Sequence, residues 1–135
     1  MIDENILDDN STVLDKPVVI GKHEATFIFE NKSADELGES IYELLVKKGY
    51  KLEDGSKVDA TYGKGSKIAR ALLGAFIKRF AFSVKITNIE GAATLIFSKD
   101  GKGYMGGVIG VVQVKNEYNS IISILGDYHS KTTDG

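Results

Sequence analysis

The chain has 135 residues, no cysteine, and 17 basic against 19 acidic side chains, which gives a net charge of −2. This length indicates one domain with a core large enough to fold without cross-links. The lack of cysteine excludes a disulfide framework, a zinc–thiolate site and a cysteine nucleophile. No apolar run approaches the roughly 18 residues of a transmembrane helix, and the acidic N-terminus lacks the pattern of a secretion signal. We therefore expect a cytoplasmic protein.

Residues 1–16 are expected to form an acidic, flexible N-terminal arm, and residues 17–135 a single α+β domain. The arm carries five acidic residues and one lysine, a charge of −4, and shows no hydrophobic periodicity. The rest of the chain then has a charge of +2, since the total is −2. A near-neutral domain of this kind does not by itself predict a nucleic-acid partner.

Residues 18–30 predict a strand with a break at Gly21. Apolar and polar side chains alternate in its second half, which is typical of a strand with one buried face. Pro17 precedes it and suits a strand edge, because proline cannot donate to a strand ladder.

Residues 34–48 predict a helix. Ser33 and Glu36 have the spacing of a capping box, in which each side chain accepts from the other residue's amide. Behind it, apolar residues recur at helical spacing and indicate one buried stripe: Leu37, Ile41, Leu44 and Leu45. Gly49 is a typical helix stop.

Residues 50–62 predict a hairpin with a two-residue turn at Asp54-Gly55. Ser66 is placed to cap a second helix over 67–79. Residues 80–87 then alternate most regularly of all, Glu90-Gly91 indicates a turn, and a returning strand follows through Phe97.

The segment after residue 106 allows two interpretations. Residues 107–114 are rich in β-branched side chains, which favours a strand. A longer stripe at helical spacing nevertheless continues from Val111 to Leu125. We predict a helix over 108–125, because that stripe is longer than a typical strand.

The expected fold class is α+β, with an antiparallel sheet of four to six strands and about three helices in the order β-α-β-β-α-β-β-α. Without the middle helix, this order resembles the TATA-binding-protein-like and helix-grip folds, in which a curved sheet wraps a long C-terminal helix. The resemblance is one of topology. It brings no family motif, so no functional residue is carried over.

The segment most indicative of a partner is basic. Residues 60–89 hold no acidic side chain and six basic ones. On a helix over 67–79, three cations share one face and apolar residues gather on the other. Two Gly-Lys-Gly turns, at 63–65 and 101–103, add basic loops. The candidate anion-binding residues are Lys64, Lys67, Arg70, Lys78 and Lys102. The competing interpretation is the solvated face of an ordinary amphipathic helix.

No motif indicates catalysis, a cofactor or a metal. Neither Gly-Lys-Gly turn has the spacing of a phosphate-binding loop, and no nucleophile elbow occurs. His23 and His129 are isolated in the sequence and are interpreted as surface residues, since a metal site needs several converging ligands.

The sequence therefore favours a small non-enzymatic binding or interaction module that contacts an anionic partner through the basic helix. Two alternatives remain open. One is a helix-grip-like protein that binds an apolar small molecule between sheet and helix. The other is an oligomeric structural subunit, a homo-oligomer joined through apolar residues off the main stripe of the last helix, namely Ile109, Val112 and Ile124.

Overall fold

The computed structural model describes residues 17–65, 80–99 and 107–134, with the side chains of the last range described over 112–132. The expected arm over 1–16 and the expected helix over 67–79 lie outside these residues. The described elements are, in chain order, β1 (Val18–Ile20), β2 (Glu24–Phe29), α2 (Ala34–Lys47), β3 (Lys51–Ser56), β4 (Asp59–Lys64), β5 (Phe80–Ile89), β6 (Ala92–Lys99) and α4 (Gly107–Asp134).

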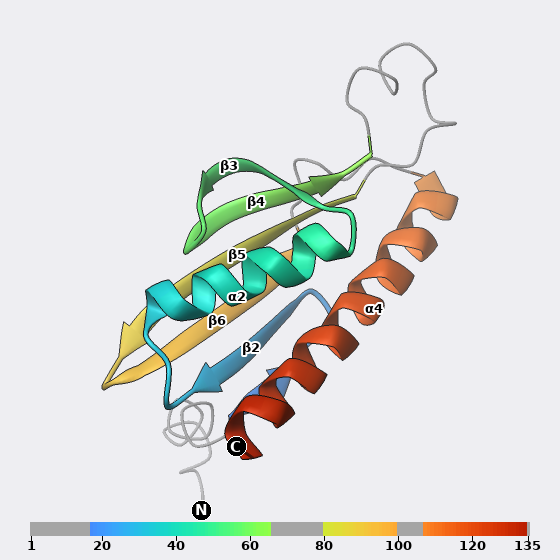
Figure 1. Cartoon of the computed structure of the whole chain (residues 1–135). Coiled ribbons are helices and arrows are strands. Elements are labelled where there is room, and N and C mark those ends of the chain that lie inside the picture. The colour runs from blue at the N-terminus through green and yellow to red at the C-terminus, as the bar shows by residue number, and fades with distance from the viewer. Residues whose placement is uncertain (1–16, 66–79, 100–106, 135) are drawn as a thin grey trace, which may run out of the picture.

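The strands form one six-stranded sheet in the order β1-β2-β6-β5-β4-β3, and every neighbouring pair is antiparallel (Figure 1). This confirms the predicted α+β class and antiparallel sheet. The described residues hold two helices rather than three, so the predicted order with a middle helix is not confirmed. The expected break at Gly21 is present: its amide donates to the Glu24 carbonyl over 2.8 Å, and β1 folds back onto β2.

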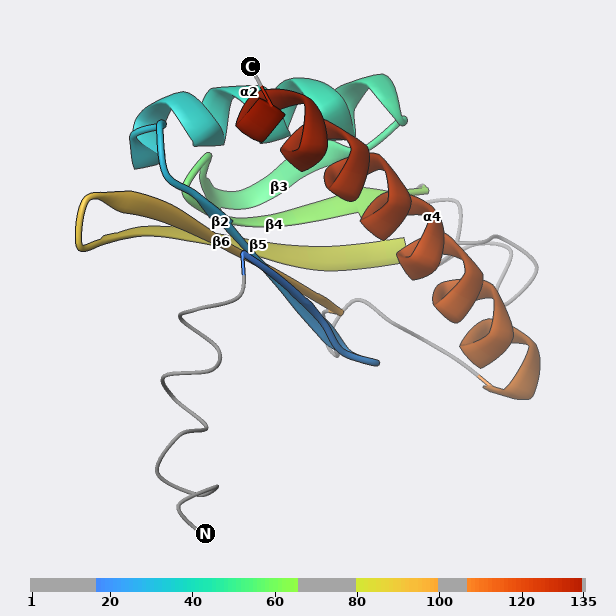
Figure 2. The ribbon, with the colours of Figure 1, turned by 90° about the horizontal axis from the view of Figure 1, so that it is seen from below.

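Both described helices lie on the same side of the sheet (Figure 2). The strand alternation decides which side chains they cover, because successive residues point to opposite faces. Inward residues such as Phe27, Phe82 and Phe97 are fully buried. The outward positions of these strands carry hydroxyl and charged side chains: Thr26, Ser83, Lys85, Thr87 and Thr94.

Helix α2 confirms the predicted cap and buried stripe. The Glu36 amide donates to the Ser33 hydroxyl over 3.1 Å, and the Ser33 amide donates to the Glu36 carboxylate over 3.0 Å. The fully buried residues of the stripe are Leu37, Ile41 and Leu45, whereas Leu44 is only partly buried.

The predicted turn at Asp54-Gly55 is wrong. Both residues lie in β3, Gly55 pairs with Ala60, and the turn falls at Lys57 and Val58. Gly55 has a φ of +86°, and the register shifts between Leu52 and Asp54. The glycine therefore serves an irregular strand, where a Cβ would collide with the carbonyl of Asp59.

Helix α4 spans 28 residues and extends nine residues beyond the predicted end at Leu125. Residues 107–114 are helical, which confirms the predicted helix and excludes the strand interpretation. The buried stripe includes Tyr118 and Ile121 and then continues through His129, which is 6% exposed. The prediction of a surface histidine at position 129 is therefore wrong.

Candidate functional site

The ends of three strands meet at one end of the sheet. The last residue of β4, Lys64, pairs with the first residue of β5, Phe80. The last residue of β6, Lys99, pairs with Phe82, two residues into β5. We call this end, where β4 and β6 end and β5 begins, the basic end of the sheet (Figure 1). The other four candidate anion-binding residues belong to two connections that start at this end, one between β4 and β5 and one between β6 and α4.

Of the five candidate residues, Lys64 is described and the other four lie outside the described residues: Lys67, Arg70, Lys78 and Lys102. The Lys64 ammonium is 3.6 Å from the Glu117 carboxylate on α4 and 5.5 Å from the centre of the Tyr50 ring. Lys48 is 3.9 Å from the same carboxylate oxygen. Two lysines and one glutamate leave a local charge of +1, so the Lys64 charge is partly compensated.

The hydroxyl of Tyr50 donates to Glu117 over 2.6 Å. Burial, and then the hydrogen bond and charge of Glu117, raise the pKa of Tyr50 well above its usual range. Tyr50 therefore remains a protonated donor at any physiological pH. Glu117, whose side chain is 14% exposed, ties α4 to β4 and to the residues that follow α2. This arrangement anchors the basic end of the sheet to α4.

A second set of contacts joins Tyr118 on α4 to the β1–β2 turn and to the end of β6. The Tyr118 hydroxyl donates to the Gly21 carbonyl over 3.0 Å, and the Lys99 amide donates to the His23 carbonyl over 3.1 Å. These two bonds hold the β1–β2 turn against α4 and against the end of β6. The Lys99 ammonium lies 5.1 Å from the centre of the Tyr118 ring.

We call Lys22, Lys99 and Lys115 the Lys99 cluster. Burial lowers the pKa of Lys99, and the charges of Lys22 and Lys115 lower it further. Among the described residues, no carboxylate lies within 4 Å of these three ammonium groups. Sequence reasoning missed this cluster, because its members lie far apart in the chain and none belongs to a basic run. The spacing of Lys115 and Tyr118, three residues apart on a helix, was the available signal.

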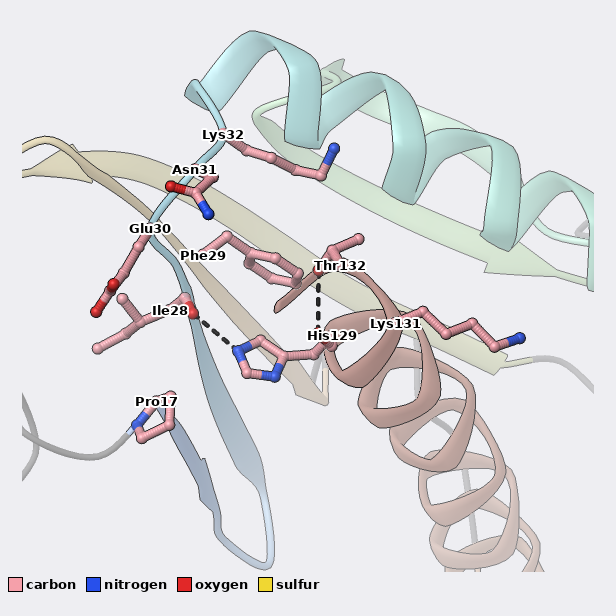
Figure 3. A pocket seen from close by; sticks show the side chains of 9 residues that line it. All are labelled: Pro17, Ile28, Phe29, Glu30, Asn31, Lys32, His129, Lys131 and Thr132. Atoms are coloured by element: carbon pink, nitrogen blue, oxygen red, sulfur yellow. Dashed lines mark hydrogen bonds between the residues drawn. The ribbon is translucent and has the colours of Figure 1, made fainter. Parts of the chain in front are cut away.

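His129 contacts the edge of β2 (Figure 3). The Ile28 amide donates to the Pro17 carbonyl over 2.8 Å. In an antiparallel ladder the Pro17 amide would return this bond to the Ile28 carbonyl, but proline has no N–H. His129 Nε2 lies 2.8 Å from that carbonyl and takes the missing place. Because a carbonyl can only accept, Nε2 carries a hydrogen.

The same edge borders a pocket of about 480 Å³. Its lining includes the positively charged side chains of Lys32 and Lys131. Both extend away from Pro17 and Ile28 in Figure 3, and the Lys32 ammonium lies 5.9 Å from the centre of the Tyr128 ring. We therefore consider this pocket a poorer candidate for an anion site than the basic end of the sheet.

The outward face of the sheet holds a hollow of about 500 Å³, whose lining includes Thr61, Ser83 and Ser98. On the described strands, the outward positions carry no aromatic ring. This face therefore lacks the platform on which RNA-binding sheets stack bases.

Within the ranges that the structure describes, no three His, Cys, Asp or Glu residues come together as a metal site. No helix in those ranges is long and apolar enough to cross a membrane. His23 is exposed in the β1–β2 turn, as predicted.

Comparisons of the chain with protein-family models, with curated proteins and with solved structures found no match.

Proposed function

We propose that this protein is a small non-enzymatic binding module that contacts an anionic partner through the basic end of the sheet. The observation that carries the proposal is the pairing of Lys64 with Phe80 and of Lys99 with Phe82. It means that the connection after β4, with three of the candidate cations, and the connection after β6, with Lys102, start at the same end of the sheet from the two strands that flank β5. The contact residues are Lys67, Arg70, Lys78 and Lys102.

Lys64 has a different part in this proposal. Its ammonium is already beside the Glu117 carboxylate and the Tyr50 ring. A cation held by a carboxylate offers less charge to a partner. Lys64 therefore anchors the start of the basic connection to α4, and the cations that follow it in the sequence contact the partner.

The expected affinity of the basic segment alone is low. Each lysine or arginine near an anionic surface contributes on the order of 1 kcal/mol. Three such residues give about 3 kcal/mol, which corresponds to millimolar or weaker binding. Useful binding therefore needs further cations at the same end, and the Lys99 cluster supplies them.

The two alternatives have less support. A ligand cavity between α4 and the sheet would need open space. The pocket beside His129 lies between β2 and the end of α4, but rings fill the interface around Tyr118. The ring centres of Phe82 and Phe97 lie 5.1 Å apart, and those of Phe97 and Tyr118 lie 5.8 Å apart. For an oligomer, Val112 is 52% exposed, but Ile124 is partly buried.

Sedimentation with vesicles tests the proposal. The wild type and the triple variant Lys67→Gln, Arg70→Gln, Lys78→Gln are compared on anionic and neutral vesicles, at low and physiological salt. A parallel titration uses nucleic acid. The matched control, Lys32→Gln, Lys85→Gln, Lys131→Gln, also removes three positive charges.

We expect the wild type and the control to bind one of the anionic surfaces with strong salt dependence, and the basic-end variant to lose this binding without a change in melting temperature. Equal behaviour of the two triple variants would show that net charge alone matters and would refute the proposed surface.

A further inference from the structure

We propose that the Lys99 cluster is a binding site for a phosphate group. The three lysines would donate to its oxygens from the β1–β2 turn, from the end of β6 and from α4. This inference rests on the proposed function and specifies the chemistry of the anion that the basic end contacts.

The three elements are held together by described contacts. Tyr118 fixes the turn through its hydrogen bond to the Gly21 carbonyl, next to Lys22. Lys99 fixes the turn a second time, because its backbone amide donates a hydrogen bond to the His23 carbonyl, and its ammonium lies over the Tyr118 ring. Lys115 precedes Tyr118 by three residues and therefore neighbours it on the surface of α4. The site is thus built by the fold and not by one flexible run of lysines.

The charges at this place are not balanced within the described residues. Burial, and then the nearby charges of Lys22 and Lys115, lower the pKa of Lys99. The carboxylate of Glu24 acts on Tyr118 from nearby. Three lysines and one glutamate leave a charge of +2. Glu117 does not compensate this charge, since it is engaged by Tyr50, Lys48 and Lys64.

A phosphate group fits this place better than a carboxylate does. A phosphomonoester carries between one and a half and two negative charges near neutral pH, about the charge that the cluster leaves uncompensated. It also presents three strong acceptor oxygens, one for each ammonium. Lysine binds phosphate as a point charge and needs no planar, two-pronged geometry.

The cluster is accessible and partly ordered before binding. Lys22 and Lys115 are exposed, and Lys99 is partly exposed. The contact of Lys99 with the Tyr118 ring holds one of the three donors in place. A donor that is already positioned loses less conformational freedom on binding.

A titration followed by NMR tests the inference on the full chain. Inorganic phosphate and pyrophosphate are added at constant pH, with sodium chloride at equal ionic strength as the blank. We expect saturable shifts of the Lys22, Lys99 and Lys115 signals, larger for phosphate and pyrophosphate than for chloride.

The variants Lys99→Met and Lys22→Gln should each weaken phosphate binding about fivefold, if each lysine contributes as it does near an anionic surface. Lys99→Met keeps an apolar stem against Tyr118, and Lys22→Gln changes an exposed turn residue, so both variants should fold. Lys85→Met, on the outward face, is the control and should bind as the wild type does.

Vesicles distinguish the source of the phosphate. If the natural group is a lipid headgroup, vesicles with phosphatidic acid, a phosphomonoester, should bind more tightly than vesicles of equal charge with phosphatidylglycerol, a phosphodiester. If it is a soluble phosphate, the two kinds of vesicle should bind alike, and pyrophosphate should compete with both.

The inference and the proposed function can fail separately. If Lys67→Gln, Arg70→Gln, Lys78→Gln abolishes binding to anionic surfaces while Lys99→Met and Lys22→Gln leave it unchanged, the basic end stands and the phosphate site is refuted. Diffuse, unsaturable shifts, equal for phosphate and chloride, also refute it. If only the Lys99 cluster variants lose binding, the phosphate site stands and the contact residues of the proposed function are wrong.

Discussion

Replacement of His129 tests the contact by which α4 completes the edge of β2. The Ile28 carbonyl loses its ladder partner because Pro17 has no N–H, and His129 Nε2 lies 2.8 Å away in the missing position. Phenylalanine at position 129 keeps a ring beside Phe29, whose centre lies 4.8 Å from that of the imidazole, but cannot donate. The substitution therefore isolates the hydrogen bond from the packing.

We expect His129→Phe to destabilise the protein by about 1–3 kcal/mol, the cost of leaving a buried acceptor unpaired. His129→Ala also removes the ring from a site that is 6% exposed. Its total should reach about 3–5 kcal/mol, as for other buried aromatic residues. His23→Ala changes an exposed histidine and should stay within about 0.5 kcal/mol of the wild type.

The assay is denaturant unfolding of the three variants, combined with a rescue. Pro17→Ala supplies the missing backbone N–H, so it should recover about 1 kcal/mol in the His129→Phe background. In the wild type the same change should give no gain, since His129 already occupies the carbonyl and alanine makes the unfolded chain less restricted. A His129→Phe variant as stable as the wild type, or a Pro17→Ala effect that is equal in both backgrounds, would refute this reasoning.

Three further changes have expected results that denaturant unfolding can check. The Tyr62 side chain is fully buried and its hydroxyl has no hydrogen-bond partner among the described residues; Tyr62→Phe should therefore be neutral or stabilising by about 1 kcal/mol, and a clear loss of stability would show that the hydroxyl has a partner. Leu45→Ala should lower the free energy of unfolding by about 2–5 kcal/mol, and Leu44→Ala, at a partly buried position, by about half as much. An equal loss at both positions would contradict the packing of α2. Ser33→Ala should cost about 1 kcal/mol by removing the cap of α2, and no loss would show that the cap is dispensable.

Patterns with a local physical cause were predictable from the sequence. The strands β2, β5 and β6 follow from alternation alone, because a strand with one buried face needs apolar residues at every second position. The cap of α2 follows from two residues whose side chains satisfy each other's amides. The turn at Glu90-Gly91 follows from its glycine, which adopts a positive φ without steric cost. Gly91 has a φ of 84°, and Glu90 has one of 51°.

The same local rule failed at Asp54-Gly55. The dipeptide favours a positive φ, and Gly55 has one, but a strand irregularity needs that conformation as much as a turn does. Which of the two forms depends on the pairing of β3 with β4, which a short sequence window does not contain.

The candidate site depended still more on tertiary structure. Lys22, Lys99 and Lys115 come together because a turn, a strand end and a helix meet at Tyr118. His129 is buried against the Ile28 carbonyl. That carbonyl lies 101 residues earlier in the chain, so no local pattern indicates the contact.

The sequence by itself determined the class of fold, most strand and helix positions, and a basic region with no acidic residue. Periodicity and capping are properties of neighbouring residues, so a chain read in order contains them. The tertiary structure decided which strand ends meet, which charges face one another and which polar groups lose water. Those depend on contacts between distant segments, and the chemistry of the basic end of the sheet arises from such contacts.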